Sequence, residues 1–369
     1  MIVHENSLPA AAYGIPTTTE VAEDSQTNQP SQACEEMVAY RISALGDVAL
    51  TSGTLLYWHI RHELRFHMVT RAALATLFYN HPAVISVIGL ENDDLHGLDE
   101  LKTFKNLAAQ FSNLKLVDLH CSIRSRLLRL LWKNKTFAYR KMSLERRIFL
   151  KSKGRFCGDK LQQINVPQRF STALTKYLGG EIPPPNDVRP AFFLTLNDFS
   201  ALPKFTAKLD QGYIALHPFA GSIHKTWPPD YWAQLAALLN DAAIPYVWIG
   251  QGADLPENMP TGQGNLVNRL DLRQTLAVLS KAALLVSGDS GPVLLARGVN
   301  TPVLSLEGPT SPGRDFYLKS EQDQVLVNQI NCRPCSLHGK VKSCKHGHAC
   351  MRGINPQAVF SAIYKMIKP

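Results

Sequence analysis

The first residue whose type and position suit chemistry is Asp47, in the run Ser43-Ala44-Leu45-Gly46-Asp47. The run follows a mostly apolar segment at 38–42 that predicts a short buried strand, and it precedes a helical pattern at 48–64. Gly46 permits a tight turn, so Asp47 stands at the helix start. A carboxylate there could take a proton from a substrate hydroxyl as a general base. It could also act only as the cap of the helix.

A second loop, residues 217–228, also lies between a predicted strand and a predicted helix. Gly221 and Ser222 offer backbone N–H groups, and Lys225 offers a positive charge. This combination suits a diphosphate. The alternative is that Lys225 is simply a solvated side chain.

A third loop, residues 286–292, has the same strand–turn–helix setting. The N–H groups of Ser290 and Gly291 are expected at the positive end of a helix, where a diphosphate binds well. Asp289 could orient the loop or accept a hydrogen bond from a sugar hydroxyl. The run is not a hydrolase nucleophile elbow, because Pro292 replaces the last glycine.

Two weaker motifs complete the set. The turn-rich loop 306–312 contains Thr310 and Ser311, whose hydroxyls could donate to phosphate. Gly250-Gln251-Gly252 begins like a dinucleotide fingerprint but lacks the third glycine, which argues against a nicotinamide enzyme.

These loops need elements to position them, and the sequence predicts two α/β domains. Strand and helix patterns alternate, which indicates parallel sheets covered on both faces. Three prolines at 183–185 fit a stiff linker better than a helix or an interior strand. We expect a disordered tail at 1–36, domains at 37–182 and 183–355, and a C-terminal helix at 356–369. Strands are expected at 38–42, 66–69, 84–88, 116–119, 213–216, 245–249, 283–286 and 303–306, and helices at 48–64, 72–80, 98–111, 231–240, 272–280, 292–297 and 356–367.

Length and composition agree with this organisation. The chain has 369 residues and is 45% hydrophobic, which suits two domains of ordinary size. We find no apolar run long enough to cross a membrane and no signal-peptide pattern at the start. The expected location is therefore the cytoplasm, where cysteines are normally reduced.

The net charge of +9 is concentrated in one segment. Residues 124–155 contain twelve Lys and Arg against a single acidic residue, Glu145. A local basic patch indicates a polyanionic partner, such as phosphorylated lipid, an anionic membrane or nucleic acid. The alternative is a solvated helix face above a buried Leu-rich one.

The ordered motifs resemble those of glycosyltransferase family 9, the ADP-heptose:lipopolysaccharide heptosyltransferases. The resemblance covers residues 38–367, and its strength lies in five motifs that occur in the family's order. They are Arg41–Val48, Asp118-Leu119-His120 with Arg124, Lys225 with Trp227-Pro228, Gly288–Pro292 and Gly308–Pro312.

The resemblance implies the GT-B architecture: two Rossmann-like domains whose parallel sheets face one another across a cleft, with the last helix crossing back to the first domain. It implies an inverting, metal-independent transfer of a heptose from ADP-heptose to a lipopolysaccharide inner-core or lipid A type acceptor. Asp47 would be the general base and Lys225 would bind the donor phosphates. The donor site would also include Ser222, Asp254, Asp289, Ser290, Gly291 and Thr310, and the acceptor site His120 and Arg124.

The basic segment would then face the phosphorylated acceptor or the cytoplasmic face of the inner membrane, as a peripheral contact. Three residues depart from the family pattern. Gly53 stands where proline is usual, Leu294 replaces a histidine, and Glu307 replaces a hydrophobic residue. A degraded paralogue that binds nucleotide sugar or glycolipid without transfer is therefore the first alternative. The second is a polyanion-binding protein, but the aromatic platforms of nucleic-acid binders are missing, and we expect no nucleic-acid partner.

Four cysteines, Cys332, Cys335, Cys344 and Cys350, lie close together near the C-terminus, with His338, His346 and His348 among them. Their spacing suits a structural zinc. Free thiols in a packed loop and disulfides remain the alternatives. No cofactor is expected to be required.

Overall fold

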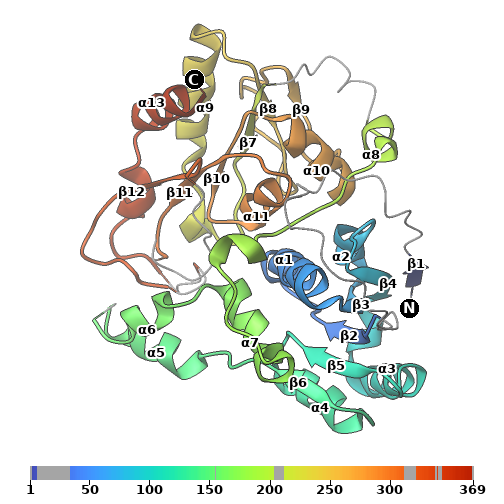
Figure 1. Ribbon diagram of the computed structural model, residues 1–369. Coiled ribbons are helices and arrows are strands. Elements are labelled where there is room, and N and C mark those ends of the chain that lie inside the picture. The colour runs from blue at the N-terminus through green and yellow to red at the C-terminus, as the bar shows by residue number, and fades with distance from the viewer. Residues whose placement is uncertain are drawn as a thin grey trace, which may run out of the picture.

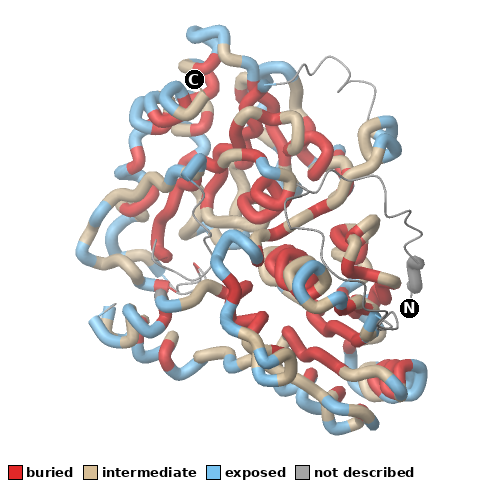
Figure 2. The backbone as a smooth tube through the Cα atoms, in the orientation of Figure 1, coloured by how far each residue is buried: buried red, intermediate tan, exposed pale blue. Residues whose placement is uncertain are grey.

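The computed structural model describes residues 2–5, 34–153, 155–202, 212–310, 321–336, 339 and 343–367. They form two α/β domains, each built on a six-stranded sheet (Figure 1). The inner strands of each sheet are largely buried and helices cover them, as the burial colouring shows (Figure 2). The expected alternation of strand and helix, with parallel sheets, is confirmed.

The N-terminal sheet has the order β1-β4-β3-β2-β5-β6 and is parallel except for β1. Its central strand β2 buries four successive residues, Met37 to Tyr40, as is typical of a strand covered on both faces. The strands are β1 (Ile2–Glu5), β2 (Glu36–Tyr40), β3 (Arg65–Arg71), β4 (Val84–Leu90), β5 (Lys115–Asp118) and β6 (Thr136–Ala138). The helices are α1 (Leu45–His62), α2 (Ala72–Ala75), α3 (Gly97–Gln110), α4 (Ile123–Leu131), α5 (Ser143–Lys151), α6 (Gly158–Gln162) and α7 (Val166–Leu178).

The C-terminal sheet is parallel throughout, in the order β12-β11-β10-β7-β8-β9. Its strands are β7 (Ile214–His217), β8 (Tyr246–Trp248), β9 (Gly264–Asn265), β10 (Leu284–Gly288), β11 (Val303–Glu307) and β12 (Gln324–Val327). Its helices are α8 (Leu196–Ser200), α9 (Pro229–Asp241), α10 (Leu272–Lys281), α11 (Gly291–Gly298), α12 (Ala349–Arg352) and α13 (Pro356–Ile367).

The linker between the domains packs directly on α1. The short helix η3 (Pro185–Val188) follows the predicted prolines. The chain then passes over Gly53, where a methyl group would lie 1.9 Å from the carbonyl oxygen of Arg189. The unusual glycine at 53 therefore leaves space for the linker backbone.

The two domains meet where α1 faces α11 (Figure 1). A methyl group on Gly291 would lie 2.5 Å from Cδ2 of Leu45, and one on Gly46 would lie 3.1 Å from Cδ1 of Leu294. Leu294, which replaces a polar residue of the family pattern, is buried in this contact. The segment that carries Asp47 and the start of α11 are thereby brought together.

Two expectations about the termini need correction. Part of the expected disordered tail is ordered, because Ile2–Glu5 form β1, which pairs with β4. The helix α13 does not cross back to the N-terminal domain. It packs on α9 and buries Val359 and Ile363 in the core of the C-terminal domain. Among the described residues, no helix is both long and apolar enough to span a membrane.

Candidate active site

Asp47 lies in the first turn of α1, where Arg41 holds its carboxylate. The guanidinium of Arg41 forms an ion pair with Asp47 and donates to the carbonyl oxygen of Leu119. It also lies 5.3 Å from the ring centroid of Phe170. Arg41 is buried, whereas Asp47 is partly exposed, so the arginine orients a carboxylate that solvent can reach.

His120 and Arg124 lie on the N-terminal side of the site. Burial, together with Arg41, Lys141, Arg124 and Arg71, lowers the pKa of His120 to about 3. Its Nδ1 is buried and has no hydrogen-bond partner within the described residues. Arg124 donates to the carbonyl oxygen of Leu95 and pairs with Glu100. A neutral imidazole among several cations suits an anionic ligand.

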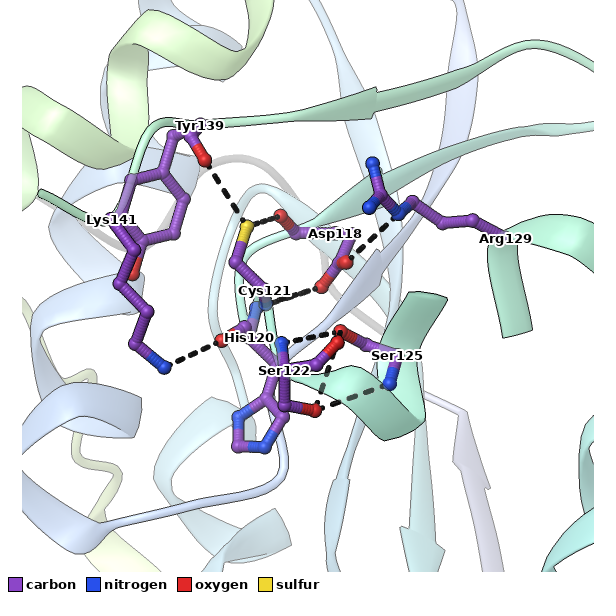
Figure 3. A network of polar contacts seen from close by, with 8 residues as sticks. All are labelled: Asp118, His120, Cys121, Ser122, Ser125, Arg129, Tyr139 and Lys141. Carbon is purple, nitrogen blue, oxygen red and sulfur yellow. Dashed lines mark hydrogen bonds and ion pairs between the residues drawn. The ribbon is translucent and has the colours of Figure 1, made fainter. Parts of the chain in front are cut away.

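The loop that carries His120 is held by the buried carboxylate of Asp118 (Figure 3). Asp118 Oδ1 accepts from the backbone N–H groups of His120 and Cys121 at 3.0 and 2.8 Å. Its Oδ2 lies 3.2 Å from Nε of Arg129 on α4. Lys141 Nζ donates to the carbonyl oxygen of His120 at 3.2 Å. Asp118 and Arg129 therefore fix the loop, and Lys141 adds a further cation.

Lys225 and Asp289 form the centre of the C-terminal side. Lys225 Nζ lies 2.8 Å from Asp289 Oδ2, and Thr310 Oγ1 donates to the same oxygen at 3.1 Å. Thr310 is buried, so it positions Asp289. The three loops that sequence analysis selected in this domain thus converge on one ion pair. Ser311 and Pro312 lie outside the described residues.

A buried histidine supports the start of α11. His217 Nδ1 lies 3.0 Å from Ser287 Oγ, which lies 2.9 Å from Ser290 Oγ. Burial lowers the pKa of His217 to about 4, so the ring is neutral. Ser290 occupies the N-cap position of α11 without a side-chain capping bond. The first N–H groups of α11 are therefore suited to an anion.

Ser222 lies beside Lys225, whose backbone N–H donates to its carbonyl oxygen at 2.9 Å. Ser222 Oγ donates to the carbonyl oxygen of Gly339 at 2.7 Å. Asp254 accepts from Asn268 Nδ2 at 3.2 Å in an exposed loop after β8. Their proposed roles at the donor remain predictions.

The cysteine cluster lines one small cavity together with His224, His346 and His348. All four thiols are free, so the disulfide interpretation does not hold. Burial raises the pKa of Cys335 and Cys350. Within the described ranges, no group of three or more His, Cys, Asp or Glu residues is arranged to hold a metal ion. The zinc interpretation thus gains no support there, while packed free thiols agree with the structure. His338 lies outside the described residues.

The roles of Arg41 and Lys141 at the site were not predictable from the sequence alone. Arg41 directly follows β2, whose last four residues are buried, and a charged residue at that position was the signal that the sequence offered. Lys141 belongs to a long basic run, where nothing in the sequence separates it from its neighbours.

A family of known proteins matches this chain. The model of glycosyltransferase family 9 (heptosyltransferase) matches residues 140–346, which is more than half of the chain. The chain belongs to glycosyltransferase family 9. The resemblance seen in the motifs is thereby confirmed at the level of this family of transferases.

Two curated relatives match parts of this family 9 chain. Lipooligosaccharide heptosyltransferase 2 of Haemophilus influenzae is 30% identical over 98 residues, and lipopolysaccharide heptosyltransferase 1 of Pseudomonas aeruginosa is 32% identical over 120 residues. These matches cover 24% and 31% of this chain and only 28% and 33% of the relatives, about a third of their length or less.

Solved structures of family 9 proteins share the fold over nearly the whole chain. Escherichia coli heptosyltransferase WaaC, solved with ADP-2-deoxy-2-fluoro heptose, superposes with a TM-score of 0.62 at 18% identity, covering 89% of this chain and 99% of that one. The E. coli ADP-heptose lipopolysaccharide heptosyltransferase II gives 0.67 at 19% identity, covering 90% and 98%. A family 9 protein of Veillonella parvula gives 0.70 at 16% identity, covering 90% and 97%. The expected GT-B fold is confirmed.

Proposed function

We propose that this protein is an inverting heptosyltransferase that moves a heptose from ADP-heptose to a lipopolysaccharide inner-core or lipid A type acceptor. The observation that carries the proposal is the meeting of two loops from different domains. Leu45, two residues before Asp47, contacts Gly291, two residues after Asp289. The loop that carries Asp47, the proposed base, thus lies at the same domain junction as the cationic, N–H-lined loops of the proposed donor site.

The proposed reaction needs residues from both domains. The acceptor hydroxyl gives its proton to the Asp47 carboxylate as its oxygen bonds to the anomeric carbon. The bond from that carbon to the diphosphate breaks, and ADP leaves with the bonding electrons. Lys225 and the N–H groups of Ser290 and Gly291 stabilise the charge that develops on the diphosphate. Attack opposite the leaving group inverts the anomeric centre, and no step calls for a metal ion.

The relatives support the choice of donor. WaaC was solved with ADP-2-deoxy-2-fluoro heptose and also with ADP. Both curated relatives are named for heptosyl transfer to lipopolysaccharide or lipooligosaccharide. The cations around His120 suit phosphate groups on such an acceptor.

Exposed side chains on the outer helices of the N-terminal domain are evidence for the proposed peripheral contact with an anionic membrane face. On α4, Ile123 and Leu130 are 85% and 83% exposed, and basic residues stand beside them. Exposed apolar residues continue on α5 and just before α6, at Leu144, Ile148 and Phe156. Apolar side chains within a basic surface fit the interface of an anionic bilayer. A cytoplasmic location is part of this proposal.

A thermal-shift panel with ADP, UDP, GDP, CMP and ADP-heptose tests the donor class. We expect the melting temperature to rise with ADP and to rise further with ADP-heptose, because a ligand that binds only the folded state stabilises it. A rise with another nucleotide alone would overturn the donor assignment. Donor binding without transfer to lipopolysaccharide acceptors would favour the degraded paralogue.

A further inference from the structure

Glu307 carries a buried carboxyl group three residues before Thr310. It ends β11, and its exposed fraction is 0%. Neither Oε1 nor Oε2 has a hydrogen-bond partner among the residues that the structure describes. An ionised carboxylate in such a place is costly unless it is paired, so the neutral acid is favoured.

The register of the sheet places Glu307 on the face that α11 covers. Ser305 pairs with Ser287, which pairs with His217, and all three side chains lie on the same face of parallel strands. Glu307 lies two residues beyond Ser305 and shares that face. It therefore belongs to the row of buried polar residues that ends at the start of α11.

The charged groups that face Glu307 come from four segments. They are Asp289 after β10, Lys225 before α9, Arg297 on α11 and Arg333 after β12. Arg297 is already paired with Asp323 at 2.8 Å, and Lys225 is paired with Asp289. Arg333 donates to the carbonyl oxygens of Thr310 and Asn328. Burial and then the negative charge of Asp289 raise the pKa of Glu307 to about 8.

We propose that Glu307 is a positioning residue that must carry a proton when the donor diphosphate binds. This inference rests on the proposed function, because it takes Lys225 and the start of α11 as the diphosphate site. Ionised Glu307 would repel the diphosphate and compete for the charge of Lys225. When Glu307 is neutral, the positive charge of Lys225 can interact with the donor diphosphate. The proton comes from solvent, and it returns there when the donor is released.

Thermodynamic linkage sets the direction in which pH changes the affinity for the donor. If the anionic donor binds better to the protonated form, donor binding must in turn raise the affinity of Glu307 for its proton. Around pH 8 and above, binding therefore takes up a proton, and affinity falls by up to about tenfold per pH unit as Glu307 ionises in the free protein.

The test is isothermal titration calorimetry of ADP binding between about pH 7.5 and 9.5, where ionisation of a phosphate with a second pKa of about 6 is complete. Each pH is measured in two buffers that differ in ionisation enthalpy, so that proton uptake is read directly. The proteins are the wild type, Glu307→Gln, Glu307→Leu and Cys350→Ser. The last is a matched control, because Cys350 Sγ would lie 3.5 Å from a methyl group on the neighbouring Gly308.

We expect proton uptake and alkaline loss of affinity in the wild type and in Cys350→Ser. Both Glu307 variants should bind ADP without proton uptake and with nearly constant affinity. Binding without uptake in the wild type, or uptake that persists in a folded Glu307 variant, would overturn the inference and leave the proposed function intact. Absence of ADP binding at every pH would overturn both.

Discussion

Lys225 Nζ lies 2.8 Å from Asp289 Oδ2, and Thr310 Oγ1 donates to the same oxygen at 3.1 Å. The pair joins the loops after β7 and β10 at the start of α11. Lys225→Ala removes the cation that would meet the donor phosphates. We expect the Kd for ADP to rise by roughly tenfold to a hundredfold, as for a lost hydrogen bond to a charged group of about 1.5–3 kcal/mol.

Calorimetry on the folded variant measures this change. Lys365→Ala, an exposed lysine on α13 of the same domain, is the control and should bind ADP as the wild type does. An unchanged Kd in Lys225→Ala would remove Lys225 from the donor site.

Asp47→Asn keeps the shape of the side chain but removes the base. Transfer should fall by about 10²–10⁴-fold, the usual contribution of a positioned general base. The affinity for ADP should stay the same, because in the proposed mechanism the carboxylate acts on the acceptor. An assay with radiolabelled donor measures the fall in transfer, and calorimetry measures the affinity for ADP. Asp99→Asn on the outer helix α3 is the control. Loss of ADP binding in Asp47→Asn would contradict the assignment.

Leu130→Glu should weaken binding to vesicles that contain anionic lipid by roughly tenfold, because burying an exposed leucine is worth about 1.5–3 kcal/mol. Vesicle sedimentation at low and moderate salt measures it. Leu196→Glu is the matched control, since Leu196 is 87% exposed on α8 of the other domain. Equal binding of the two variants would argue against α4 as the membrane contact.

Gly53→Ala should lower the free energy of unfolding by about 1–3 kcal/mol, the usual cost of forcing atoms into a filled space. The added methyl group would overlap the carbonyl oxygen of Arg189 and push the linker away from α1. Gly180→Ala is the control, because its methyl group would meet nothing closer than 3.9 Å. Chemical denaturation compares the two, and equal stability would mean that the linker yields at no cost.

Much of the fold was predictable because its strands are short apolar runs bounded by turns. The expected strand at 84–88 corresponds to β4, which is two residues longer. The expected strand at 303–306 corresponds to β11, which is one residue longer. The outer elements β6, β9 and β12 were missed. They are short or partly exposed, so the apolar signal was absent.

The site was predictable in its loops but not in its pairings. Asp47 and Lys225 could be selected because each follows a strand and precedes a helix. Nothing in the sequence shows that Arg41 pairs with Asp47 or Lys225 with Asp289, since these contacts depend on tertiary structure. The end of the chain was misjudged for the same reason. An amphipathic pattern predicts that α13 buries one face, but it does not say which domain covers that face.

Glu307 also makes stability depend on pH, and this prediction needs no ligand. Between its ordinary pKa of 4.5 and its folded pKa of about 8, the folded protein holds a proton that the unfolded chain has lost. The folded state therefore loses stability as pH rises through this window, by at most about 1.4 kcal/mol per pH unit. Below the window the contribution is constant, because both states are protonated. Above it both are ionised and the loss is complete.

Glu307→Gln removes the titrating group and keeps its size. Its melting temperature should approach or exceed that of the wild type as pH rises from about 5 to about 8, and the difference should then level off. Thermal melts at several pH values measure the difference, in which the titrations shared by both proteins cancel. Glu321→Gln, at an exposed glutamate of the same domain, should show no such trend. A constant difference between Glu307→Gln and the wild type across this range would mean that Glu307 does not gain a proton on folding.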